Sequence, residues 1–128
     1  MLNENLTKYQ SEGLRKLIRY KKKYALNDTA YKSNRKIIDE FITLFCEYDL
    51  ADNDYMAIQL AANGQNSLTN YIFKNKLSLE SILKCITYII WTDRIVDNYL
   101  YNRLKDNTLI ELMNQLEELL SKEQKMEC

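Results

Sequence analysis

The chain has no histidine and no proline, and only two glycines and three cysteines among its 128 residues. Without histidine, neither a Ser-His-Asp nor a Cys-His nucleophilic site can form within the chain, and zinc sites that use imidazole are excluded. Two glycines leave no glycine-rich phosphate loop of the Walker or dinucleotide type. The cysteines, Cys46, Cys85 and Cys128, are odd in number and widely spaced, which excludes a disulfide framework. We therefore expect no metal and no cofactor, and an enzyme only if carboxylates, arginine or tyrosine carry the chemistry.

Long apolar runs are missing as well. No stretch approaches the roughly 18 apolar residues of a membrane-spanning helix. The first residues, MLNENLTKYQ, lack the apolar centre of a signal peptide, so we expect a cytoplasmic protein that does not enter a membrane. Hydrophobic residues make up 46% and charged residues 28% of the chain, which together with its length predicts one globular domain with a real core.

The scarcity of helix breakers and the recurrence of apolar residues at i, i+3, i+4 and i+7 predict an all-α fold. We expect a single compact bundle of five to seven helices over residues 1–128, with a basic N-terminal helix in 1–26, a helical core in 35–120 and a frayed tail at 121–128. The predicted helices cover residues 5–24, 34–48, 52–64, 67–73, 78–90, a sixth segment around 95–100, and 108–120, and the core is expected from 34–48, 78–90 and 108–120.

Local signals mark several helix ends. Thr108 and Glu111 have the spacing of a capping box, in which each side chain accepts a hydrogen bond from the backbone N–H of the other. Ser78 is the expected N-cap of the most apolar segment. Whether that segment continues through Trp91, which we expect in the core, or breaks at Thr92-Asp93 is left open. Three further acidic residues lack the glycine and glutamate of a calcium loop and are interpreted as helix-capping residues, namely Asp49, Asp52 and Asp54.

The formal net charge of zero hides an asymmetry between the two ends of the chain. Residues 1–36 carry ten basic and three acidic side chains, a net charge of +7, and residues 37–128 carry −7. A basic, tyrosine-interleaved helix of this kind could follow a phosphate backbone, bind an acidic protein, or dock against the acidic remainder of the same domain. Intramolecular docking is the favoured interpretation. The candidate partner-binding residues are Arg15, Lys16, Arg19, Tyr20, Lys22, Lys23 and Tyr24.

A second charged group follows the most apolar segment. Arg94 and Asp97 are three residues apart, so they are expected to pair on one helix face. A buried arginine paired with Asp97 or Asp93 would fix the angle between neighbouring helices, and we favour that structural role. An anion-binding or ligand-binding site built on Arg94 is the alternative.

Residues 82–120 carry the pattern Y-I-I-x-x-D-R and, further along, D-N-T-L with a leucine-rich helix. The pattern resembles a widespread family of small helical proteins of bacteria and phages, a domain of unknown function. The likeness covers about residues 35–120, and the family has glycine where Asn107 stands. The resemblance implies a helical fold and no activity. The matching positions are Tyr88, Ile89, Ile90, Asp93, Arg94, Ile95, Asp106, Thr108, Leu109, Leu112, Leu116 and Leu119.

Three functions are compatible with these features. The first is a small non-enzymatic protein-binding module, such as a phage or mobile-element inhibitor of a host defence complex of the anti-CRISPR type, with a host nucleoprotein complex as its partner. The second is a nucleic-acid-binding protein that uses the basic N-terminal helix. The third is a histidine-free enzyme or ligand-binding protein that uses Asp93, Arg94 and Asp97. A monomer and a homodimer both stay open.

Overall fold

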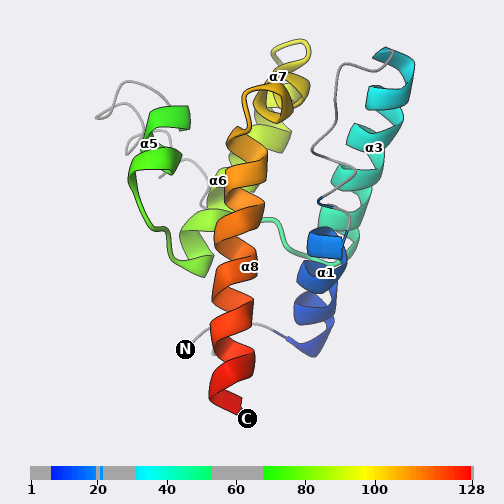
Figure 1. The fold of residues 1–128 in the computed structure, drawn as a ribbon. Helices are drawn as coiled ribbons and strands as arrows, with labels where there is room; N and C mark the ends of the chain where they lie inside the picture. Colours follow the sequence, from blue (N-terminus) through cyan, green and yellow to red (C-terminus); the bar gives the residue numbers. More distant parts are fainter. Residues whose placement is uncertain (1–6, 20, 22–30, 53–67, 128) are drawn as a thin grey trace.

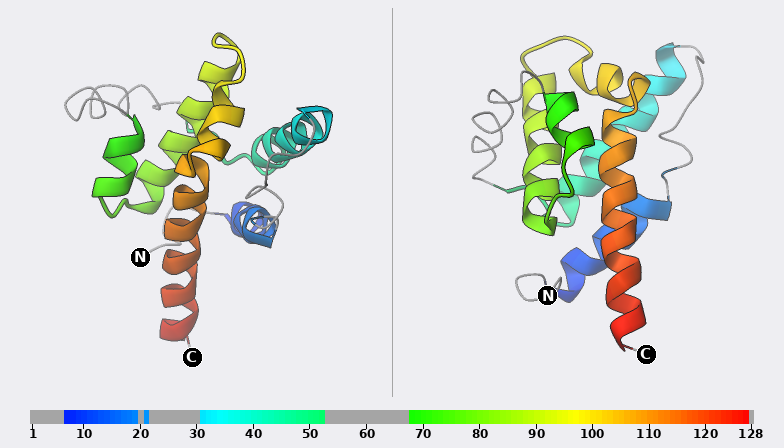
Figure 2. Two further views of the ribbon diagram at one scale, coloured as in Figure 1. Left: turned by 45° about the horizontal axis from the view of Figure 1, so that its top comes forward. Right: turned by 60° about the vertical axis from the view of Figure 1, so that its left-hand side comes forward.

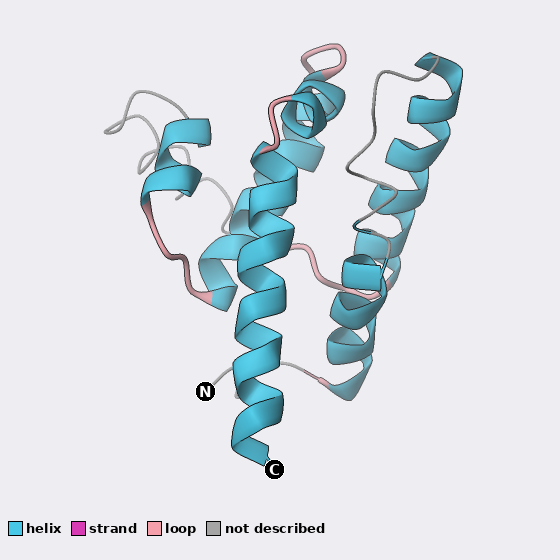
Figure 3. Cartoon of the chain, in the orientation of Figure 1, coloured by secondary structure: helices cyan, strands magenta, loops and turns pink. Residues whose placement is uncertain are grey.

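A computed structural model describes residues 7–19, 21, 31–52 and 68–127, which form α-helices and no strand (Figure 3). The all-α prediction is therefore confirmed for these residues. The helix predicted over 52–64 lies outside them from residue 53 onward. Within the same ranges, none of the helices has the length and apolar run that a bilayer crossing requires. The helices are α1 (Lys8–Arg19), α3 (Tyr31–Glu47), α5 (Leu68–Lys74), α6 (Leu79–Asp93), α7 (Tyr99–Lys105) and α8 (Thr108–Glu127).

Helix α8 runs through the middle of the described structure (Figure 1). It contacts α1, α5, α6 and α7, while α3 contacts α1 and α7. Figure 2 shows from two more directions that α1 and α3 lie on one side of the α6–α8 pair and α5 on the other. The short helix α7 connects the end of α6 to the start of α8, so the chain reverses direction at this corner.

The core forms where the apolar stripes of these helices meet. The three helices expected to build it, α3, α6 and α8, supply most of its buried side chains, and α1 adds Leu14 and Leu17, neither of which is exposed. Helix α6 is the most buried element, because its apolar residues cover most of its circumference. Its buried residues are Ile82, Leu83, Cys85, Ile86, Thr87, Ile89 and Ile90.

Helix α6 begins as predicted and ends at Asp93. The apolar segment therefore breaks at Thr92-Asp93 and does not continue as one helix. The Ser78 hydroxyl accepts a hydrogen bond from the Ser81 N–H at 3.2 Å, so Ser78 is the N-cap. After Asp93 the chain turns through Asn98, whose φ of 61° is left-handed, a conformation that asparagine tolerates better than most residues. The Asp93 carboxylate accepts from the Leu100 N–H at 3.0 Å and thereby caps the first turn of α7.

The contacts at the start of α8 differ from the predicted capping box. The Thr108 N–H donates to Asp106 Oδ1 at 3.0 Å, and the Glu111 N–H donates to the carbonyl of Asn107 at 2.9 Å. Asp106 takes the role expected of Glu111 because its carboxylate lies only two residues away and needs no long side chain to be ordered. Helix α8 also continues to Glu127 and so runs through most of the segment 121–128 that was predicted to fray.

A capping box is present instead at the start of α1. The Gln10 N–H donates to Thr7 Oγ1 at 3.0 Å, and the Thr7 N–H donates to Gln10 Oε1 at 2.9 Å. These two bonds satisfy backbone donors that the helix itself leaves unpaired. The Thr-x-x-Gln spacing of Thr7 and Gln10 is the signal in the sequence that corresponds to this box.

Burial of Cys85 makes the stability of the fold sensitive to high pH. Burial raises the pKa of the Cys85 thiol to about 12, and it also raises the pKa of the half-buried Tyr71 and Tyr99 hydroxyls. Above about pH 8.5 the unfolded chain ionises its thiol while the folded chain keeps the proton, so the free energy of unfolding falls by up to about 1.4 kcal/mol per pH unit.

We expect Cys85→Ala to flatten this dependence between about pH 8.5 and pH 10, before unfolded-state tyrosines begin to ionise. Urea unfolding measured across that range gives the slope for each variant. Cys46→Ala removes an exposed thiol from α3 and is the matched control. If the free energy of unfolding of Cys85→Ala fell with pH as steeply as that of wild type, the pH dependence could not be assigned to the Cys85 thiol.

Candidate functional site

The turn between α6 and α7 presents two large apolar side chains to solvent. Ile95 is 85% exposed and Val96 is 49% exposed. Single exposed apolar residues are ordinary on protein surfaces, but two neighbours at the tip of a turn form a small patch that is typical of contact sites. We refer to residues 94–97 as the α6–α7 tip.

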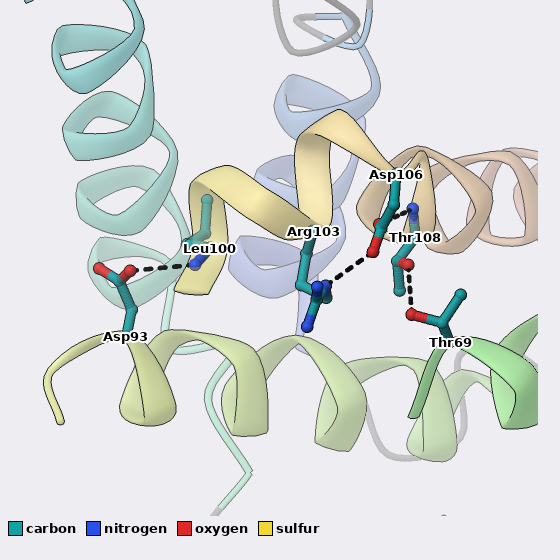
Figure 4. A network of polar contacts seen from close by, with 6 residues as sticks. All are labelled: Thr69, Asp93, Leu100, Arg103, Asp106 and Thr108. Atoms are coloured by element: carbon teal, nitrogen blue, oxygen red, sulfur yellow. Dashed lines mark hydrogen bonds and ion pairs between the residues drawn. The ribbon is translucent and has the colours of Figure 1, made fainter. Parts of the chain in front are cut away.

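Polar contacts at both ends of α7 hold the tip in place (Figure 4). At one end Asp93 binds the Leu100 N–H, as described above. At the other end Arg103 Nε donates to Asp106 Oδ2 at 3.0 Å. Beyond Asp106, the buried Thr108 hydroxyl lies 2.8 Å from the hydroxyl of Thr69 on α5. The tip is therefore carried on an anchored helical corner, which lowers the entropy lost when a partner binds it.

A pocket of about 540 Å³ lies beside the tip, between α3 and the α6–α7 turn. This volume is in the range of small-ligand sites. Ile42 and Ile90 give it an apolar part, and the remaining side chains are charged or polar. The residues that line it are Arg35, Asp39, Ile42, Ile90, Asp93, Arg94, Asp97 and Asn98.

One wall of the pocket is an ion-pair group centred on Arg35. Its guanidinium lies 3.1 Å from Asp39 Oδ1 on the same helix and 3.7 Å from Asp93 Oδ2 across the pocket. The Asp93 side chain is only 7% exposed. The sequence predicts that Arg94 pairs with Asp93 or Asp97 and fixes the angle between neighbouring helices. In the structure the arginine that pairs with Asp93 is Arg35 of α3. The predicted pair between Arg94 and Asp97 does not form.

Arg94 also lines the pocket and is exposed. Its guanidinium carbon lies 3.8 Å from the centre of the Trp91 ring, so the two planar groups make a cation–π contact. Trp91 is half-buried, so the prediction that it lies in the core is wrong; one face of its indole packs against Arg94. The structure thus brings Asp93, Arg94 and Asp97 to the lining of one pocket.

Two substitutions of Asp93 should distinguish the contribution of its hydrogen bond to Leu100 from that of its ion pair with Arg35. Asp93→Asn keeps an oxygen that can accept from the Leu100 N–H and loses the charge opposite Arg35, so it should lower the free energy of unfolding by only about 0.5 kcal/mol. Asp93→Ala removes both contacts and should lower it by about 1.5 kcal/mol. Urea unfolding of both variants gives the comparison, and equal losses would show that Asp93 does not cap α7.

The structure describes only some of the candidate basic residues near the N-terminus. Arg15 and Arg19 are exposed on α1, whereas Tyr20, Lys22, Lys23 and Tyr24 lie outside the described residues. Lys16 donates a hydrogen bond to the hydroxyl of Tyr48, in the turn that directly follows α3, and this bond raises the pKa of the Lys16 ammonium group. Lys21 pairs with Glu117 and with Asn114 on α8.

The basic segment therefore docks in part against its own domain, which was the favoured interpretation. A smaller pocket of about 270 Å³ lies at this junction, lined by Lys16, Arg19, Leu44, Glu47 and Tyr48. The carboxylates of Glu117, which pairs with Lys21, and of Glu47, which lines this pocket, both reduce the positive potential that a phosphate backbone would meet along the basic segment.

Comparisons with protein-family models, curated proteins and solved structures find no match for this chain. Among the described residues, no group of three or more cysteine, aspartate and glutamate side chains is placed to hold a metal ion. The function proposed below therefore depends on the geometry of the tip and of the pocket beside it.

Proposed function

We propose that this chain is a protein-binding module whose contact surface is the α6–α7 tip together with the rim of the adjacent pocket. The exposure of Ile95 is the observation that carries the proposal. An isoleucine left 85% exposed gains nothing in the isolated domain, whereas its burial in a partner would contribute about 2 kcal/mol.

The surroundings of Ile95 have the composition of a contact site. Binding hot spots are enriched in tryptophan and arginine, and the tip places the stacked Arg94 and Trp91 beside the apolar pair. The charged pocket rim supplies polar contacts around an apolar centre. Because the corner is anchored at both ends of α7, we expect the surface to change little on binding.

The partner proposed for this module is a host complex that handles nucleic acid, as an inhibitor encoded by a phage or mobile element would require. The opposite charges of residues 1–36 and 37–128 support this choice. Direct nucleic-acid binding through α1 has less support, because Lys16 and Lys21 are engaged within the domain. We also propose that the protein acts in the cytoplasm, where such complexes operate.

The test is capture of partners from the cells that carry the gene, with the wild-type chain and Ile95→Asp compared by quantitative mass spectrometry. A charge at the centre of an apolar contact should reduce capture of the partner at least about tenfold. Phe73→Asp is the matched control, since Phe73 is another exposed apolar residue, 49% exposed, on α5.

The identity of what is captured decides the finer part of the proposal. A nucleoprotein complex that is retained by wild type and Phe73→Asp, and lost in Ile95→Asp, is the expected result. Equal capture by all three chains would contradict a role for the tip. Capture of free DNA or RNA that is abolished by Arg15→Gln with Arg19→Gln would favour the nucleic-acid-binding function instead.

A further inference from the structure

Arg94 is held in a geometry that leaves its hydrogen-bonding edge available. The indole of Trp91 covers one face of the guanidinium at 3.8 Å. All N–H donors of a guanidinium lie in its plane, so a stack on its face does not use them. The stack also restricts the side chain before any ligand arrives, which reduces the entropy lost on binding.

No carboxylate of the described residues lies within ion-pairing distance of Arg94. The two other arginines of this corner differ in that respect, because Arg35 pairs with Asp39 and Asp93, and Arg103 pairs with Asp106. Arg103 also lies over an aromatic ring, that of Tyr99 at 4.7 Å, yet its Nε is already engaged. Arg94 and Arg103 thus both stack on an aromatic ring. Arg94 differs from Arg103 because it stacks without also pairing with a carboxylate.

The charged residues of the pocket determine which anions can bind to Arg94. Asp39, Asp93 and Asp97 line the same pocket as Arg35 and Arg94, so the pocket residues sum to one negative charge. A dianion such as a phosphate would be repelled by these aspartates more strongly than a carboxylate with a single charge. A planar carboxylate also matches the fork of a guanidinium in a bidentate pair.

We propose that Arg94 is the receptor for a carboxylate of the partner protein, carried next to an apolar side chain that packs on Ile95 and Val96. This inference rests on the protein-binding function proposed above and names the chemistry that the tip recognises. The order of residues supports it, because the arginine and the two exposed apolar residues are consecutive in the tip.

Trp91 makes the proposal directly measurable, since it is the only tryptophan of the chain. The probes are three capped dipeptides, acetyl-leucyl-aspartate amide and its asparagine and phosphoserine counterparts, titrated at constant ionic strength. Trp91 fluorescence and the NMR shift of its indole N–H report binding. We expect a saturable change with the aspartate peptide, a weaker response to the phosphoserine peptide and none to the asparagine peptide.

Three variants assign the response to Arg94. Arg94→Lys keeps the charge but loses the planar fork, so it should weaken binding of the aspartate peptide about tenfold. Arg94→Gln should abolish it, and Arg15→Gln, which removes the same charge from an exposed site on α1, should leave it unchanged. Equal responses to the aspartate and asparagine peptides, tighter binding of the phosphoserine peptide, or wild-type binding by Arg94→Gln would overturn the proposal.

The outcomes also separate this inference from the function on which it rests. Partner capture that depends on Ile95, together with no response to the aspartate peptide, overturns the carboxylate assignment and leaves the protein-binding function standing. A response to the peptide without any Ile95-dependent partner overturns the protein-binding function.

Discussion

Gly13→Ala should lower the free energy of unfolding by about 2 kcal/mol, although alanine is the better helix former by about 1 kcal/mol. Gly13 is buried where α1 crosses the end of α3. A Cβ added there would lie 2.4 Å from Cβ and 2.5 Å from Cγ of Tyr48. Because Tyr48 Cβ is fixed to the backbone, no rotation of the ring removes the overlap, and the two segments must move apart.

Urea unfolding followed by circular dichroism measures this loss. Arg15→Ala changes an exposed position of the same helix and should leave the free energy of unfolding within about 0.5 kcal/mol of wild type. A Gly13→Ala variant as stable as wild type, or more stable, would show that α1 does not approach α3 so closely.

Gln115→Glu should lower the free energy of unfolding by about 3 kcal/mol at neutral pH, although the two side chains have the same shape. Gln115 Oε1 accepts from the Leu77 N–H at 2.8 Å. Its Nε2 donates to the carbonyls of Ile72 and Asn75 at 3.2 and 3.1 Å, and to Glu111 Oε2 at 3.2 Å. The Gln115 amide therefore attaches the end of α5 and the α5–α6 connection to α8. A carboxylate in its place has no hydrogen to donate to the oxygens of Ile72, Asn75 and Glu111.

The pH dependence distinguishes lost donors from a simple packing defect. The new carboxyl would have a raised pKa in the folded chain, so its protonated form, which can donate one hydrogen bond, is favoured by folding. Stability lost at neutral pH should therefore be partly regained as the pH is lowered through that pKa.

Asn114→Asp is the matched control for Gln115→Glu. It introduces the same charge at the neighbouring position of α8, where the side chain is exposed and accepts from Lys21 Nζ at 3.0 Å. We expect it to leave stability unchanged or slightly raised. Equal losses in the two variants would contradict the role given to Gln115.

The helices and the core could be predicted because helical periodicity is a local property of the sequence. The apolar spacing of residues 78–90 is enough to predict both a helix and its burial. The cap of α8 could not be settled in the same way. Thr108 has two carboxylates in reach, Asp106 and Glu111, and the spacing of a motif does not say which one its N–H will choose.

The candidate site was predicted only in part, because its main contacts join distant segments. Asp93 and Arg94 were recognised from their position after an apolar helix, but the pairing of Asp93 with Arg35 depends on how α3 packs against this corner. Ile95 and Val96 fall in the sixth helical segment predicted around 95–100, and nothing in the apolar spacing marks them as exposed. Their exposure follows from the end of α6 at Asp93, which places both residues in a turn and not on a packed helix face.

Site-specific photocrosslinking in cells tests the central claim most directly, namely that the α6–α7 tip is the surface that meets a partner protein. A photoreactive phenylalanine analogue would replace Ile95 in one chain and Phe73, on α5, in another. The account predicts a discrete crosslinked protein adduct from position 95 and none from position 73. Equal crosslinking from the two positions, or an adduct from position 73 alone, would contradict it.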